Sequence, residues 1–172
     1  MQESPVHNRD DSDAYAFRPV QRSDMPMLGH WLRLPQVSRW WGDPAEQLSL
    51  LASDLDEPGM VMNLVTFQGR PYAYIQDYAI HRWPQPHLTA LPQGSRGLDC
   101  FIGRPEMFGG GHGSAFLRRR AIQLRATGAP TVAIDPDVRN LRARRACLAA
   151  GFRSRGEVDT DEGRACLLVF DG

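Results

Sequence analysis

The chain has 172 residues, of which 42% are hydrophobic, and its twenty basic and twenty acidic side chains give a formal net charge of zero. This length favours one domain with a sizeable core, and the charge balance argues against wholesale binding to nucleic acid or to an acidic membrane. Three cysteines without Cys-x-x-Cys spacing argue against a disulfide framework or a zinc site. Because no apolar signal region or membrane-length apolar run is present, we expect a cytoplasmic protein.

The N-terminal part predicts a tail, a strand and two helices. Residues 1–13 are polar and predict disorder, which leaves residues 14–172 as one folded domain. The strand covers residues 15–20, and Ser23 is the expected N-cap of the first helix. The second helix is expected to begin at Asp43, which is followed by a proline.

Two adjacent tryptophans lie between these helices, where residues 38–42 interrupt the helical pattern. Trp40 and Trp41 suit a core or staple position, because their rings bury a large apolar area. At an elbow between two helices they equally suit the wall of a ligand site. The sequence leaves both interpretations open.

A hairpin follows, with strands over residues 61–67 and 70–78 joined by a Gln-Gly turn. Residues 79–96 then form a long Pro-rich segment, and a loop of that length in a compact domain is usually functional or disordered. His81 and His87 in this segment have no third metal ligand at a recognisable spacing. We therefore expect no metal site.

The central stretch combines an acidic residue with a glycine-rich loop. Asp99 lies in an apolar strand over residues 97–102, where a charge is costly unless it has a partner or a function. Glycines crowd residues 109–113, directly before a helix predicted over residues 114–126. Because glycine backbone curls freely and helix N-termini attract anions, the loop predicts a phosphate-binding site. It is no Walker loop, since the chain contains no lysine.

The C-terminal part predicts a short strand, a helix and a final hairpin. The strand covers residues 131–134, and Asn140 is the expected cap of a helix over residues 141–150. The last two strands cover residues 152–159 and 164–170. The whole order predicts an α/β fold with a mixed central sheet, antiparallel at first, and helices on both faces.

Two segments together resemble the GCN5-related N-acetyltransferase (GNAT) family. The first is Phe108-x-x-Gly111-x-Gly113 at the start of a helix, and the second combines the motifs Asp135-Pro136, Asn140-Leu141-Arg142-Ala143 and Gly151-Phe152. Within that family the chain resembles bacterial aminoglycoside 6′-N-acetyltransferases over residues 15–170. Further motifs carry this closer resemblance: Trp40-Trp41-Gly42, Tyr74-Ile75-Gln76-Asp77-Tyr78 and Gly97-Leu98-Asp99.

The resemblance implies a GNAT-like single domain that uses acetyl-CoA as co-substrate and no metal. It implies transfer of the acetyl group to a primary amine of a small polycationic acceptor, above all the 6′-amine of an aminoglycoside, as in antibiotic resistance. The implied partners are such an aminoglycoside or another polyamine, without nucleic acid or membrane. The implied assembly is a monomer or a homodimer.

The resemblance also implies roles for individual residues. Asp99 corresponds to the active-site aspartate of the family. The residues implied to bind the cofactor, several of them through their backbone, are Cys100, Phe101, Ile102, Phe108, Gly109, Gly110, Gly111, His112, Gly113, Ser114, Asn140 and Arg145. The residues implied to contact the acceptor are Trp41, Gln76, Tyr78, Asp99, Asp135 and Asp161. With Asp77 and Glu162, these acids predict an acidic wall that concentrates a cation.

Three departures from the family pattern leave other functions open. Phe108 replaces the usual arginine or glutamine, Cys147 replaces a tyrosine that is a candidate general acid, and residues 79–96 lack an acidic side chain. One alternative is an N-acyltransferase for a siderophore precursor, a hydroxylamine or amine, which is expected to use a histidine such as His81 or His87. The other is a non-catalytic acyl-CoA-binding module.

Overall fold

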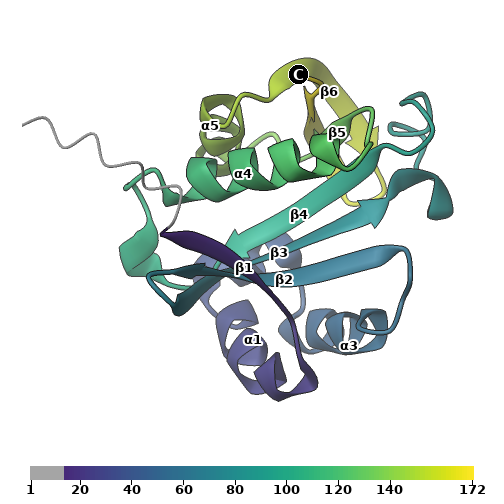
Figure 1. Cartoon of the computed structure of the whole chain (residues 1–172). Coiled ribbons are helices and arrows are strands. Elements are labelled where there is room, and N and C mark those ends of the chain that lie inside the picture. Colours follow the sequence, from purple (N-terminus) through teal and green to yellow (C-terminus); the bar gives the residue numbers. More distant parts are fainter. Residues whose placement is uncertain (1–13) are drawn as a thin grey trace, which may run out of the picture.

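Seven strands form one mixed sheet in a computed structural model that describes residues 14–172 (Figure 1). The expected tail, residues 1–13, lies outside the described residues. The strand order is β1-β2-β3-β4-β5-β7-β6, and the pairing of β4 with β5 is parallel. The strands are β1 (Tyr15–Pro19), β2 (Met60–Phe67), β3 (Arg70–Ala79), β4 (Arg96–Ile102), β5 (Val132–Ile134), β6 (Arg153–Thr160) and β7 (Gly163–Phe170). This confirms the predicted mixed sheet.

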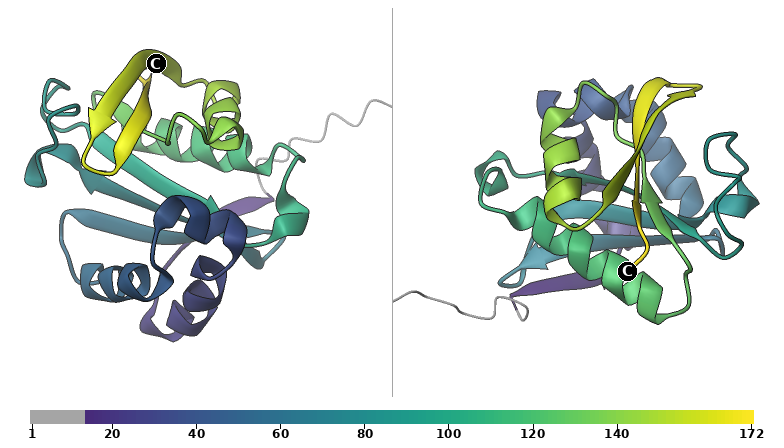
Figure 2. Two further views of the ribbon diagram at one scale, coloured as in Figure 1. Left: turned by 180° about the vertical axis from the view of Figure 1, so that it is seen from behind. Right: turned by 90° about the horizontal axis from the view of Figure 1, so that it is seen from above.

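Helices cover both faces of the sheet (Figures 1 and 2). One face carries α1 (Met25–Leu32), α2 (Pro35–Trp41) and α3 (Pro44–Asp54), and the other carries α4 (His112–Ala126) and α5 (Leu141–Ala149). Each face has its own apolar cluster, centred on Leu28, Trp31 and Tyr74 under the first set and on Phe116 and Leu117 under the second. In the part of the chain that the structure describes, no helix combines the length and apolarity needed to cross a membrane.

Two expectations about the N-terminal helices are wrong. Residues 38–41 do not interrupt a helix but end α2, which begins at Pro35 and stops where Gly42 adopts a φ of 87°. Proline fits the first helical position, and a positive φ at glycine ends a helix. Ser23 is also no cap, because the chain entering α1 is held instead by Asp24, whose carboxylate accepts the Gln21 N–H at 2.8 Å.

The pleat of β3 sends alternate side chains to opposite faces. Tyr74 packs with the α1 cluster, whereas Ile75 packs with the α4 cluster. Asp77 lies on the α4 face as well, where it is 1% exposed and forms ion pairs of 2.6 Å with both Arg96 and Arg120. The expectation that Asp77 belongs to an acidic wall with Asp99 is therefore wrong, since it is neutralised and on the opposite face.

The parallel strands β4 and β5 separate soon after they meet. Their register pairs Arg96 with Val132 and Gly97 with Ala133, whereas β4 remains paired with β3 as far as Ile102. The β5-facing edge of β4 therefore lacks a neighbouring strand in the register beyond Gly97. Backbone N–H and C=O groups along such an edge can bind an extended ligand as an added strand would.

Gly103→Ala should destabilise the fold, because the added Cβ would overlap the indole ring of Trp31. That ring is 4% exposed and meets Phe101 edge to face, so it has little room to move. Overpacking of this kind costs about 1–3 kcal/mol of unfolding free energy, measurable by urea denaturation. Gly113→Ala is the matched control, since its Cβ would make ordinary contacts at 3.7 Å. Equal stability of the two variants would contradict the prediction.

Candidate active site

A short chain of hydrogen bonds on the α1 face centres on Asp99 of β4. The antiparallel register places Gln76 of β3 directly opposite Asp99. The Gln76 Nε2 donates to Asp99 Oδ2 at 2.9 Å, and the Gln76 Oε1 accepts from the Tyr74 hydroxyl at 2.7 Å. Two of the residues implied to contact the acceptor therefore meet, and the position of the Asp99 carboxylate is fixed from the neighbouring strand.

The surroundings of Asp99 favour its protonated form. The pKa of Asp99 is raised to about 7: burial is the largest cause, the charges of Asp135 and Glu162 add to it, and the hydrogen bond from Gln76 opposes it. A carboxyl group with a pKa near neutrality exists in both protonation states at physiological pH. Such a group can accept and release protons far more readily than an ordinary aspartate with a pKa near 3.9.

Asp135 brings a second carboxylate to this face from the chain that follows β5. Its Oδ2 lies 2.6 Å from Nε2 of His87. Burial raises the pKa of Asp135, and the contact with His87 opposes that increase. Asp135 and Asp99 are near enough for the charge of one to raise the pKa of the other, so the structure brings these two predicted acceptor contacts together.

The turn between β6 and β7 brings a third carboxylate, Glu162, near this group, and Asp161 lies beside it in the same turn. The charge of Glu162 raises the pKa of both Asp99 and Tyr78, so this carboxylate lies close enough to the site to act on both groups. Both Asp161 and Glu162 are exposed in this two-residue turn. Sequence reasoning named both acids for the acidic wall and, from the family resemblance, chose Asp161 as an acceptor contact, which stays a prediction.

Aromatic rings line the α1 face beside these carboxylates. Trp41 meets Tyr74 and Phe101 edge to face, with ring centroids 6.0 Å and 4.9 Å apart. Tyr78 covers Gly97, where an added Cβ would overlap the phenol ring, and Trp83 lies 6.5 Å from Tyr78. Trp41 thus packs on the core while keeping part of its surface exposed, which is compatible with both roles considered for it.

The glycine loop has the geometry of an anion site at the start of a long helix. Gly109 and Gly111 have φ values of 80° and 79°, and Gly111 immediately precedes α4. A Cβ added at Gly111 would meet no atom within 4 Å, so the loop opens into free space at the helix N-terminus. Together with the unpaired edge of β4, this arrangement fits a ligand that carries amides and a pyrophosphate.

Several residues implied to bind a cofactor have other partners for their side chains. The His112 Nδ1 lies 2.8 Å from the Tyr15 hydroxyl, and the side chain of Asn140 caps α5 by accepting from the Ala143 N–H at 3.2 Å. The guanidinium of Arg142 lies 4.0 Å from the ring centroid of Phe108. Phe108 therefore joins the glycine loop to α5. Arg145 is exposed on α5.

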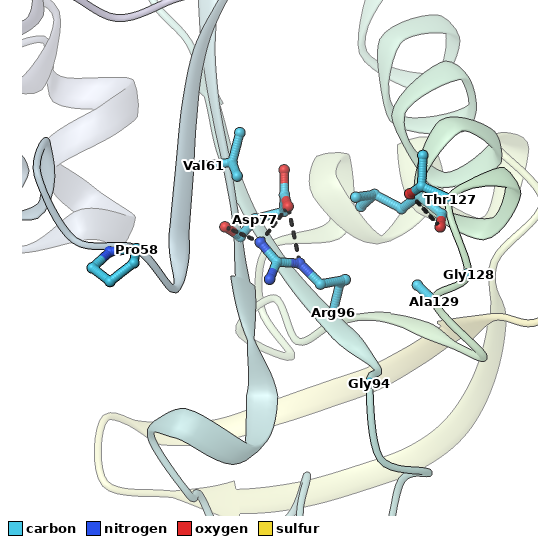
Figure 3. Close-up of a pocket in the computed structure, with 9 residues that line it drawn as sticks. Pro58, Val61, Asp77, Gly94, Arg96, Thr127, Gly128 and Ala129 are labelled. Atoms are coloured by element: carbon cyan, nitrogen blue, oxygen red, sulfur yellow. Dashed lines mark hydrogen bonds and ion pairs between the residues drawn. The ribbon is translucent and has the colours of Figure 1, made fainter.

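A separate cavity of about 390 Å³ lies on the other face of the sheet, at the C-terminal end of α4 (Figure 3). Arg96 and Asp77 point toward one another there, and Gly128 and Ala129 form part of its lining. Because Asp99 faces the opposite side, this cavity is separate from the group of carboxylates. In residues 14–172, no cluster of three or more His, Cys, Asp or Glu side chains is placed to hold a metal.

The sequence matches the family model for the acetyltransferase (GNAT) domain over residues 20–160. The chain belongs to the GNAT acetyltransferase family. The predicted resemblance is thereby confirmed, and with it the expectation of an acetyl-CoA-dependent N-acetyltransferase.

The relatives of this GNAT protein are named for two classes of acceptor, aminoglycosides and lysine. An aminoglycoside N(6′)-acetyltransferase type 1 from Klebsiella pneumoniae is 28% identical, with 92% of this chain and 83% of the relative covered. A lysine N-acyltransferase from Mycolicibacterium paratuberculosis is also 28% identical, with 91% and 73% covered. A solved structure of the aminoglycoside acetyltransferase AAC(6′)-Ib with ribostamycin and coenzyme A aligns with a TM-score of 0.83 at 26% identity, covering 92% and 94% of the two chains.

Cys147 marks a departure inside the core of this GNAT fold. Its side chain is 1% exposed in the cluster beneath α4 and α5. Burial and the neighbouring Cys166 raise the pKa of the Cys147 thiol to about 12, so it stays protonated at neutral pH. Burial likewise raises the pKa of Cys100 well above its usual value, and neither group is activated as a thiolate.

The pKa of Asp99 should fall in an Asp135→Asn variant, because the charge that raises it is removed. Titration of carboxyl-labelled aspartate by ¹³C NMR measures the pKa directly. Asp137→Asn is the matched control, since Asp137 lies two residues away and its charge is paired with Arg139. The prediction fails if the Asp99 pKa is the same in the wild type and in Asp135→Asn.

Proposed function

We propose that this enzyme acetylates a primary amine of a small polycationic acceptor, with the 6′-amine of an aminoglycoside as the leading candidate. The observation that carries the proposal is the grouping of Asp99, Asp135 and Glu162 on one face, beside the free edge of β4. Anionic side chains at one place attract a cationic acceptor and raise its local concentration. The relatives named for aminoglycosides supply the acceptor class.

The proposed role of Asp99 follows from the state in which such acceptors arrive. Primary amines are largely protonated at neutral pH, and an ammonium group has no lone pair with which to attack an acyl carbon. In our proposal the Asp99 carboxylate takes one proton from the ammonium, so an N–H bond breaks and an O–H bond forms. Its pKa of about 7 suits a general base at neutral pH. Gln76 holds the carboxylate in place.

The remaining features hold the donor. When bound, the co-substrate would supply an activated acetyl thioester: the C–N bond would form as the C–S bond breaks, and coenzyme A would leave as the thiol, its sulfur gaining the second proton that the amine nitrogen loses. In our proposal, the backbone of β4 beyond Gly97 binds the pantetheine amides, and the N–H groups of residues 109–114 bind the pyrophosphate. The reacting groups would then be held together by positioning, which can supply a large part of the rate enhancement.

A panel assay tests the proposal. Release of free thiol from acetyl-CoA should be fastest with kanamycin-type and ribostamycin-type aminoglycosides, slower with linear polyamines, and slowest with lysine or hydroxylamines. Expression in a susceptible bacterium should raise the inhibitory concentration of the accepted aminoglycoside. Fastest release with lysine or a hydroxylamine would instead assign the enzyme to the siderophore-precursor class. A melting shift with acetyl-CoA but no turnover of any amine would indicate the non-catalytic module.

A further inference from the structure

His87 is a buried histidine that contacts one of the clustered carboxylates from a segment outside the sheet. It lies in residues 79–96, and its side chain is 4% exposed. The segment is held against the sheet because Ile80 and Leu88 are buried with Ala133 and Leu167. The Nε2 atom of His87 meets Asp135 Oδ2 at 2.6 Å. An ordered segment thus presents one imidazole to one of the carboxylates.

The contact leaves the two ring nitrogens in different situations. Nε2 faces a carboxylate oxygen, and a hydrogen on Nε2 makes this a short charge-assisted hydrogen bond. Nδ1 is buried and has no hydrogen-bond partner among the described residues. All of the polar bonding of this ring in the structure is therefore directed at Asp135. A histidine with one carboxylate partner fixes the position and orientation of that carboxylate.

Asp135 has surface left for a second partner. Its side chain is 19% exposed, five times as much as that of His87, while Oδ2 is occupied by Nε2. His87 therefore holds the carboxylate through Oδ2, while part of the Asp135 side chain remains accessible close enough to Asp99 to act on its charge. This arrangement is expected of a carboxylate that binds a cation while a hydrogen bond from a neighbouring residue fixes its orientation.

We infer that His87 is a positioning residue for the acceptor: by donating from Nε2 it fixes Asp135 as the carboxylate that binds an ammonium group of the acceptor. The inference rests on the proposed function and adds a residue that the acidic side chains alone do not reveal. Asp99 receives the proton from the reacting amine, whereas Asp135, held by His87, binds an ammonium group of the acceptor. The inference therefore places the effect of His87 on acceptor affinity and not on the chemical step.

Steady-state kinetics with the best amine of the panel test the inference. His87→Leu removes the donor and should raise the acceptor KM about 10- to 100-fold, as expected for loss of a hydrogen bond to a charged group. Turnover should stay within about threefold and the KM for acetyl-CoA should not change, because His87 bonds to Asp135 and not to Asp99 or the glycine loop, and the Asp135 carboxyl group is retained. His87→Gln keeps an N–H near the position of Nε2 and should restore most of the affinity.

His81→Leu is the matched control, because His81 lies in the same segment but its Nε2 contacts the Thr89 carbonyl oxygen at 3.3 Å. It should leave the acceptor KM unchanged. Equal acceptor KM values in His87→Leu and His81→Leu would overturn the inference, as would a failure of His87→Gln to improve on His87→Leu. A wild-type protein that turns over no amine would instead overturn the proposed function itself.

Imidazole ¹⁵N NMR provides a readout that needs no substrate and no variant at position 87. The Nε2 of His87 should carry a hydrogen at pH 7 in the wild type, and its resonance should move when Asp135 is replaced by alanine. An Nε2 without hydrogen, or one that is insensitive to Asp135→Ala, would overturn the inference even if the His87 variants failed to fold.

Discussion

Asp99→Asn should lower the turnover number at least about 100-fold while leaving acetyl-CoA binding intact. General acid–base groups contribute roughly 10²–10⁴-fold, and asparagine keeps the size of the side chain but cannot take a proton. The donor is expected to contact the backbone of β4 and the glycine loop, so the melting shift produced by acetyl-CoA should persist. Thiol release and thermal scans on the same preparation measure both quantities.

The same substitution should raise stability in alkaline solution. Because the folded-state pKa of Asp99, about 7, lies above the ordinary value near 3.9, folding favours its protonated form. The resulting stabilisation is complete below the unfolded-state pKa and is lost as the pH rises through the folded-state value. Asparagine carries no such charge. The melting temperature of Asp99→Asn should therefore exceed that of the wild type at pH 8, and the difference should shrink as the pH falls and close only below about pH 4.

Two outcomes would contradict the assignment of Asp99. Retention of more than about a third of wild-type turnover at neutral pH would show that Asp99 is not the base, and proton loss to water with catalysis by positioning would replace it. Unfolding of the variant would show a structural role. Asp161→Asn serves as the control, because this exposed turn residue loses a similar carboxylate outside the Gln76 hydrogen bond.

Gly111→Val should abolish the melting shift that acetyl-CoA produces. Ligand binding to the folded state stabilises by about 2.7 kcal/mol at a hundredfold excess over the dissociation constant, and this gain disappears when a side chain blocks the glycine loop. The new side chain would project into the open space at the start of α4. Its φ of 79° also strains any residue with a Cβ, so some intrinsic stability is lost as well.

Gly128→Val separates these two effects. Gly128 has a φ of 107° and a Cβ there would also meet nothing within 4 Å, but it follows the C-terminal end of α4. We expect this control to lose intrinsic stability and to keep the full acetyl-CoA shift. Normal acetyl-CoA binding by Gly111→Val would mean that the glycine loop does not hold the phosphates.

Much of the fold was predictable because its elements have strong local signals. The β2–β3 hairpin has a two-residue turn at Gln68 and Gly69, and the Asn140 cap of α5 was predicted correctly. The helix α2 was missed, because its seven residues include two tryptophans and a β-branched valine, which weaken helical propensity. Tertiary packing of Val37 and Trp41 on the core favours the helix there.

The candidate site was less predictable, since it depends on which way side chains point. Asp99 stood out as a charge in an apolar strand, and its contact with Gln76 requires only that β3 and β4 pair. Asp77 was assigned to the wrong face because neighbouring residues of a strand point in opposite directions. The contact between His87 and Asp135 joins residues 48 positions apart, and no sequence period indicates such a pair.

The alternation of side chains along β3 separates the residues that face the acceptor from the residues that pack toward α4. Tyr74 and Gln76 lie on the face with the carboxylates, whereas Ala73 and Ile75 pack toward α4, the helix that follows the glycine loop. Substitutions on the first face can alter the chemistry offered to an acceptor without repacking the second. We therefore expect acceptor preference to diverge faster in evolution than donor use, as the two acceptor classes among relatives of equal identity suggest.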